Sequence, residues 1–540
     1  MIDVSDWMKF FPFKSARDEQ IRAINSILSS FESGKRYVIA ELGTGLGKSA
    51  IAVTVSRYLQ SKYTNDGSWY LTTQKTLQQQ YVDDFSNKGI KTIKSSSNYC
   101  CQLFKESKTG MTCADVHRLI GVHPFFKTVY GVCLQKCKYK EDKALFLESY
   151  DSVTNYSYFF AESGYAHQIQ RRSLLVCDEA HTIESALSNF VEVTISEHFA
   201  RSQLGMKKFP SVSYTIDDVV KWLSTSYKRA VGKKLDECKK YMKDNEGKEK
   251  LETLTSYAKR FELLDKHVCK INRFITNYDV DNWTMTINHN DDKRSKIVFK
   301  PVDVSRYSDE KLFSFGDKTL LMSATILDID NFCSTLGIDT KDVDVVKIPS
   351  PFKPENRPIH VLSIGSMSKR SIENTLPKIA IAVKTIIDEH VSDKGIIHCT
   401  SFKIANYIRD NVKSDRLIFH DGSSREAALH QHVVSKKPTV LVSPSMMEGI
   451  DLRDDASRFQ IMCKVPFPFL GDEVVKKRMQ RDPKWYACQT MRSIVQGLGR
   501  SIRNENDHAT SYILDSDWSY FMHANSKIVP HEISSAIIKH

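Results

Sequence analysis

A glycine-rich segment near the start of the chain, GTGLGKS at positions 43–49, has the residue types of a phosphate-binding loop. Its turn would be formed by Gly43, Thr44, Gly45 and Gly47. Such a turn points backbone N–H groups at phosphate oxygens, while Lys48 can reach the terminal phosphates and the Ser49 hydroxyl can bind Mg²⁺. The strict motif has a further glycine where this chain has Leu42. A plain surface loop is the alternative, but the spacing favours a nucleoside triphosphate site.

Two acids and a histidine follow the apolar run LLVC, in the sequence DEAH at 178–181. At the end of a parallel strand, Asp178 can hold Mg²⁺ and Glu179 can act as the general base toward water. We expect His181 to couple hydrolysis to a neighbouring domain. An isolated tetrapeptide of this kind is as often a helix cap, but the preceding phosphate loop favours hydrolysis.

Two arginines near the C-terminus, in QGLGRSIR at 496–503, are spaced to act on a phosphate. On a helix, Arg500 and Arg503 would share one face and approach the γ-phosphate from a second domain. Gln496 would lie one turn earlier and position water. Such pairs are more often solvent-exposed, so the prediction depends on the phosphate loop and the acids.

A cysteine cluster coincides with the most basic part of the chain. Five of the twelve cysteines lie close together: Cys100, Cys101, Cys113, Cys133 and Cys137. Residues 91–140 hold nine lysines and arginines against two acids. Thiolates suit Zn²⁺ or an iron–sulfur cluster, and the spacing differs from paired C-x-x-C zinc ribbons. Unligated thiols in a reducing compartment are the third alternative.

Alternating strands and helices are predicted on either side of a different middle region. Apolar runs at 36–42, 69–73, 174–178 and 318–325, with helix-like stretches at 48–63 and 74–85, predict a first α/β unit with a parallel sheet. Runs at 359–364, 395–400, 416–420, 439–444, 459–467 and 510–515 predict a second. Between them, the strand signal fades over 196–300 into long charged segments, which predicts an inserted, mainly helical domain, and the proline-rich 349–358 predicts a linker.

Composition sets the broad class. The chain has 540 residues, 41% hydrophobic and 26% charged, which predicts several globular domains. Its net charge of +12 favours polyanionic partners. We find no apolar run of about 20 residues and no export signal at the start, so we expect an intracellular protein without a membrane anchor.

Several segments resemble the motifs of superfamily 2 helicases: LTTQKTLQQQ (71–80), DEAH, LLMSAT (320–325), SPSMMEGIDL (443–452) and QGLGRSIR. They are similar to motifs Ia, II, III, V and VI, and the resemblance spans nearly the whole chain. Within that superfamily, SNYCC (97–101), CKY (137–139) ahead of TNYSYF (154–159), and the long insert resemble the XPD/DinG branch.

The resemblance implies an α/β fold with two RecA-like parallel-sheet motor domains, an inserted Cys-rich Fe–S module and an inserted, mainly helical, arch-like domain. The expected boundaries are 1–92, 141–195 and 301–350 for motor domain 1, 93–140 for the Fe–S module, 196–300 for the arch-like insert, and 351–540 for motor domain 2.

It also implies roles for further residues. The ligands of a [4Fe–4S] cluster would be Cys101, Cys113, Cys133 and Cys137, with Cys100 as a spacer and zinc as the less favoured metal. Arg17 and Gln20 would contact adenine. Glu448, Gly449 and Asp451 would line the nucleotide cleft, and Ser323 and Thr325 would link the ATP state to domain movement.

The function implied is an ATP-dependent DNA helicase that translocates 5′→3′ on single-stranded DNA, with the Fe–S module as a wedge. The alternative is a translocase that displaces proteins or RNA without extensive unwinding. A non-motor phosphate-loop enzyme and a nuclease are less favoured. We expect ATP and Mg²⁺ as cofactors, single strands and single-strand/duplex junctions as partners, and a monomer; no protein partner is indicated.

Overall fold

The computed structural model describes residues 2–63, 67–85, 87, 89–102, 110–120, 137–166, 168–245, 251–289, 295–444, 452, 454–499, 501–502 and 507–538. Among these residues, no helix combines the length and apolar character needed to cross a bilayer.

The first motor domain is built on a seven-stranded, all-parallel sheet. In spatial order its strands are β10 (Val343–Ile348), β1 (Tyr37–Leu42), β9 (Gly316–Ser323), β5 (Arg172–Cys177), β2 (Ser68–Thr72), β4 (Asp151–Asn155) and β3 (Lys91–Thr92). The central strands are buried, as expected for a parallel sheet covered on both faces. Separate hydrophobic cores fill the two faces.

Helices cover this sheet and carry its site residues. They are α1 (Val4–Met8), α2 (Asp18–Glu32), α3 (Lys48–Lys62), α4 (Lys75–Phe85), α7 (Lys138–Glu148), α8 (Tyr156–Ala161), α9 (Ile183–Val191), α14 (Ser305–Lys311) and α15 (Ile329–Leu336).

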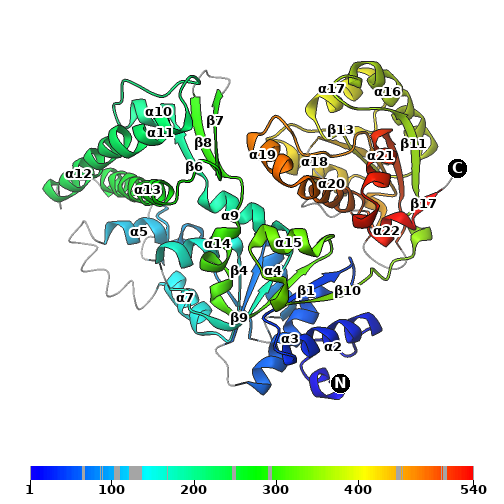
Figure 1. Cartoon of the computed structure of the whole chain (residues 1–540), viewed down its shortest axis with the longest axis horizontal. Helices are drawn as coiled ribbons and strands as arrows, with labels where there is room; N and C mark the ends of the chain where they lie inside the picture. The colour runs from blue at the N-terminus through cyan, green and yellow to red at the C-terminus, as the bar shows by residue number, and fades with distance from the viewer. Residues whose placement is uncertain are drawn as a thin grey trace.

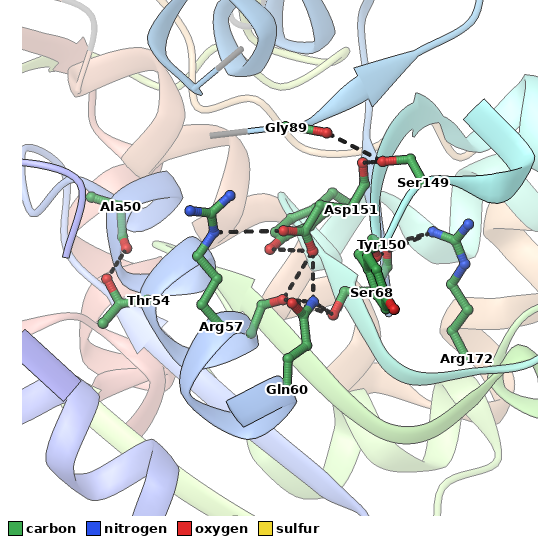
Figure 2. A network of polar contacts seen from close by, with 12 residues as sticks. Ala50, Thr54, Arg57, Gln60, Ser68, Gly89, Ser149, Tyr150, Asp151 and Arg172 are labelled. Atoms are coloured by element: carbon green, nitrogen blue, oxygen red, sulfur yellow. Dashed lines mark hydrogen bonds and ion pairs between the residues drawn. The ribbon is translucent and has the colours of Figure 1, made fainter. Parts of the chain in front are cut away.

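A buried carboxylate ties α3 to the sheet at the end opposite the glycine-rich loop. Figure 2 shows Arg57 and Gln60 of α3 converging on Asp151 of β4, at 3.6 Å and 2.9 Å. Ser68 of β2 completes the contact through the hydroxyl of Ser56. Because a buried charge needs such partners, this network fixes the axis of α3 and therefore the position of its first turn.

The second motor domain repeats the design. Its all-parallel sheet has the order β13 (Leu417–Phe419), β14 (Val440–Ser443), β12 (Gly395–His398), β15 (Phe459–Met462), β16 (Thr510–Asp515), β11 (Ile359–Gly365) and β17 (Ile537–Ile538). Its helices are α16 (Ile372–Glu389), α17 (Phe402–Asn411), α18 (Arg425–Val434), α19 (Glu473–Arg481), α20 (Pro483–Leu498), α21 (Asp517–Ala524) and α22 (His531–Ser534).

The insert is mainly helical but also contains a small sheet. Its helices are α10 (Glu197–Ser202), α11 (Ile216–Trp222), α12 (Lys228–Asp244) and α13 (Leu251–Thr276). The antiparallel strands β6 (Val193–Ser196), β8 (Ser295–Pro301) and β7 (Trp283–His289) lie beside them. The predicted mainly helical insert therefore also carries strands that the sequence did not indicate.

Figure 1 shows the insert and the second motor domain side by side, both above the first motor domain. The short helix α5 (Cys113–Leu119) lies beneath α13 and shares a hydrophobic cluster with it. The predicted fold class, two parallel-sheet motor domains with an inserted, mainly helical domain, is confirmed.

Candidate functional site

The glycine-rich loop lies between β1 and α3, as the sequence predicted, and packs closely against the linker to motor domain 2. Gly45 and Gly47 have φ of +85° and +72°, a left-handed conformation that favours glycine. A Cβ atom on Gly45 would lie 2.3 Å from the Phe352 ring. The Ser350 hydroxyl donates to the carbonyl oxygen of Thr44 at 3.0 Å. The loop therefore needs its glycines both for its turn and for this close approach.

Arg17 and Gln20 form hydrogen bonds to the backbone of the same loop. Arg17 Nη2 donates to the carbonyl oxygen of Gly45 at 2.8 Å, and Gln20 Nε2 donates to that of Leu46 at 3.0 Å. Gln20 Oε1 in turn accepts from the Arg17 backbone N–H, which caps α2. Both residues thus stabilise the loop backbone. Their contact with adenine stays a prediction.

The acids lie opposite the first turn of α3. Lys48 Nζ is 3.8 Å from Glu179 Oε1. The Tyr81 hydroxyl donates to Asp178 Oδ2 at 3.3 Å and also interacts with Ser49, which brings Ser49 and Asp178 to one place. Burial raises the pKa of Asp178 to about 6, the Glu179 charge adds to the rise, and the Lys48 charge opposes it. A cation between these groups would favour the ionised carboxylate.

His181 connects the two motor domains. Its Nδ1 lies 2.8 Å from Ser323 Oγ, and its Nε2 lies 2.6 Å from Gln496 Nε2 on α20. Because an amide nitrogen only donates, Nε2 accepts and Nδ1 carries the proton. Ser323 Oγ also accepts from the backbone N–H of Thr325 at 3.0 Å. The segment DEAH, the segment SAT and α20 thus form one hydrogen-bonded chain.

Six residues named by the sequence analysis lie outside the described residues: Cys133, Glu448, Gly449, Asp451, Arg500 and Arg503. Helix α20 ends at Leu498, before both arginines, so their placement on one helix face with Gln496 stays a prediction.

Three side chains near the cysteines converge on one point. Cys113 Sγ, His117 Nε2 and Cys137 Sγ all lie within 4.8 Å of one another, with the two sulfurs 3.1 Å apart. Cys113 and His117 are four apart on α5 and share a face, while Cys137 precedes α7. Sulfur and imidazole donors fit Zn²⁺ and iron–sulfur centres alike. This donor set therefore fits a metal without choosing between them.

The other two described cysteines of the cluster differ in their surroundings. Cys101 is buried in the hydrophobic cluster between α5 and the insert, and Cys100 is exposed. Neither belongs to the group of converging donors found among the described residues.

Sequence reasoning missed three residues of the site. His117 had a usable signal, since C-x-x-x-H on a helix is a chelating spacing. Tyr81 reads as one more apolar residue of α4. Glu184, on α9, accepts hydrogen bonds from α20 of the other motor domain, and nothing in the sequence pairs these two segments.

Comparisons with known proteins agree with this architecture. A family model described as "Type III restriction enzyme, res subunit" matches residues 13–207, and one described as "Helicase C-terminal domain" matches residues 385–527. The two matches fall on the first and second motor domains.

Named relatives give the same result. The chain is 25% identical to the ATP-dependent DNA helicase YoaA of Haemophilus influenzae, over 38% of this chain and 33% of that protein. It is 20% identical to a probable ATP-dependent helicase of Methanocaldococcus jannaschii, over 94% of this chain and 93% of that protein. The chain thus matches about a third of the length of YoaA and nearly all of the archaeal relative.

Among solved structures, one titled XPD helicase superposes with a TM-score of 0.62 at 16% identity, covering 98% of this chain and all of that one. This likeness shows the fold. In its two-sheet fold, its matched domains and the order of its motifs, the chain is thus similar to superfamily 2 helicases of the XPD/DinG branch.

Proposed function

We propose that this protein is an ATP-dependent DNA helicase that translocates 5′→3′ on single-stranded DNA. The observation that carries the proposal is the contact between His181 of motor domain 1 and Gln496 of motor domain 2, beside Lys48 and Glu179. A site assembled from two domains changes when the domains move, so hydrolysis in it can be coupled to movement along a strand.

The residues at the cleft divide the chemistry of hydrolysis among them. The glycine-rich loop and Lys48 bind the phosphates, while Ser49 and Asp178 hold Mg²⁺, which offsets charge on the phosphates. Glu179 accepts the proton of the attacking water. Arg17 and Gln20 hold the loop in shape and contact adenine, and Gly449, Asp451, Arg500 and Arg503 complete the nucleotide site from motor domain 2.

Gln496 and His181 respond to the state of the nucleotide. The Oε1 atom of Gln496 is buried and has no hydrogen-bond donor among the described residues, which leaves it available to a bound water. When Gln496 shifts, His181 moves with it. Because His181 is hydrogen-bonded to Ser323, the movement reaches Ser323 and the neighbouring Thr325.

The cysteine cluster holds a [4Fe–4S] centre in this proposal, with Cys101, Cys113, Cys133 and Cys137 as ligands and Zn²⁺ as the alternative metal. The convergence of Cys113 and Cys137 supports a metal of either kind. The basic surroundings support a place for the module at the junction of single strand and duplex. The protein acts as a monomer inside the cell.

Strand displacement tests the proposal. We expect the protein to separate a short duplex that carries a 5′ single-stranded tail, only with hydrolysable ATP, and not the same duplex with a 3′ tail. Lys48→Ala is the control that retains DNA binding without unwinding. Release of a bound protein from single strands without any duplex separation would instead favour a translocase, and unwinding without ATP would contradict both.

A further inference from the structure

One face of α20 makes a row of contacts with motor domain 1. Four side chains at helical spacing form this row: Trp485, Gln489, Arg492 and Gln496. Arg492 Nε donates to the carbonyl oxygen of Thr325 at 3.2 Å, and Gln496 contacts His181. The first two residues of the row, Trp485 and Gln489, both contact Glu184. The row therefore spans from Glu184 to the DEAH segment.

Glu184 lies in the first turn of α9, three residues after His181. Its carboxylate accepts from Trp485 Nε1 at 2.9 Å and from Gln489 Nε2 at 3.1 Å. Arg478 Nη2 of α19 lies 3.7 Å away. The Glu184 side chain is only 18% exposed, so its charge depends on these partners, all of which belong to motor domain 2.

The two ends of the row are mechanically linked. A rigid helix carries eleven residues over about 16 Å, so fixing Trp485 on Glu184 fixes where Gln496 meets His181. If α20 moved away, the Glu184 carboxylate would lose its hydrogen-bond donors, which is costly for a largely buried charge. This anchor therefore favours the one arrangement of α20 in which the two hydrolytic segments touch.

We propose that Glu184 is a positioning residue for ATP hydrolysis, which anchors α20 across the domain interface so that Gln496 is held against His181. Among the described residues its hydrogen bonds go to Trp485 and Gln489 of α20, so in this proposal it acts through Gln496. The expected effect on the rate of ATP hydrolysis rests on the proposed function. The expected effect on the position of α20 does not require any activity.

The structural consequence is tested by hydrogen exchange of the protein without nucleotide. In Glu184→Gln, an acceptor remains but the charge that Arg478 neutralises is lost, and amides of 483–498 should exchange at least about tenfold faster than in the wild type. Trp485→Phe removes the Nε1 donor while keeping an aromatic ring at this position, and should give the same local effect. Glu373→Gln, at an exposed carboxylate on α16, is the matched control. Unchanged exchange across α20 in both interface variants would overturn the anchor.

The kinetic consequence is tested by a double-mutant cycle. Glu184→Gln should lower kcat for ATP hydrolysis at least about tenfold with KM for ATP within about twofold, because positioning acts on the reacting arrangement and not on nucleotide binding. In Gln496→Ala the same change should add little, since the residue through which Glu184 acts is gone. If the fold-losses in kcat of the two single variants multiplied in the double variant, the inference would be overturned. Absence of ATPase in the wild type would refute the proposed function and the kinetic role, while the exchange result would still decide the anchor.

Discussion

Lys48 and Glu179 lie 3.8 Å apart beside the glycine-rich loop. In the reaction that we propose, Lys48 binds the γ-phosphate and Glu179 accepts a proton from the attacking water. The proposed contribution of Lys48 is therefore electrostatic and local to the nucleotide.

Lys48→Ala should therefore lower ATP hydrolysis at least about 100-fold while leaving the affinity for single-stranded DNA within about twofold. Steady-state hydrolysis and fluorescence anisotropy of a labelled single strand measure the two effects. Retained hydrolysis in this variant would remove Lys48 from the reaction.

A second prediction at this scale concerns the converging donors Cys113, His117 and Cys137. Purified without oxygen, the wild type should contain metal, and Cys113→Ser should lose most of it because a hydroxyl is a poor ligand for a soft metal. Cys269→Ser, at an exposed cysteine of the insert, should keep it. Metal and sulfide analysis gives the answer, with iron and sulfide together indicating the cluster and zinc alone the alternative.

Single residues were the least predictable part of the site. Lys48 and His181 could be proposed from motif spacing, because each lies in a short segment whose residues are adjacent in the sequence. Tyr81 and Glu184 were missed, because the residues that they contact lie about 97 and 301 positions away in the sequence. The shared helical face of Arg500 and Arg503 stays a prediction, because both residues lie outside the described part of the chain.

Helix α5 makes separate contacts on two of its faces. One carries Cys113 and His117, and the other packs on α13 of the insert through Val116 and Leu119. Charges frame this contact: Arg118 pairs with Glu262, and Lys259 with Asp115 at 2.8 Å. Among the described residues, α5 thus joins the converging Cys and His side chains to the insert.

A charge reversal tests that joint. Arg118→Glu should place like charges together and speed hydrogen exchange in α5 and the facing part of α13, whereas the double variant with Glu262→Arg should recover most of the protection. Lys234→Glu, on the neighbouring α12, controls for the change in net charge. Equal exchange in the single and double variants would mean that the ion pair does not hold the joint.

The elements themselves were well predicted where burial is complete. Strands such as β1 and β5 are continuous apolar runs, which a parallel sheet requires. The β7–β8 pair was missed although β8 alternates in burial, because its lysines and the charged residues around it matched an exposed helix.

At the scale of the whole molecule, a half-buried histidine and a buried one link stability to pH. Burial lowers the pKa of His267, in the insert, to about 4, and that of His432, in motor domain 2, to about 4. Both stay neutral in the folded chain but would protonate near 6.5 when unfolded. The folded state then binds fewer protons, so stability is present above pH 6.5 and is lost as pH falls toward 4.

We therefore expect the melting temperature to fall by at least a few degrees between pH 6.5 and pH 4.5. His267→Gln should show a weaker dependence, because glutamine does not protonate. Differential scanning fluorimetry across this range measures both proteins, and equal slopes would exclude His267 as a source of the effect.

The relative placement of the two motor domains could be inferred from sequence only through the family resemblance. Lys48 and Gln496 are far apart in the chain and are linked through Glu179 and His181, by contacts of α20 with motor domain 1 that no local pattern encodes. The central claim is that both domains act on one ATP.

The rate of ATP hydrolysis by the full chain, with and without single-stranded DNA, tests this claim most directly. The account predicts a rise of at least about tenfold with DNA, lost in Lys48→Ala and equally in Gln496→Ala. Hydrolysis that ignores DNA, or that survives in Gln496→Ala, would contradict it.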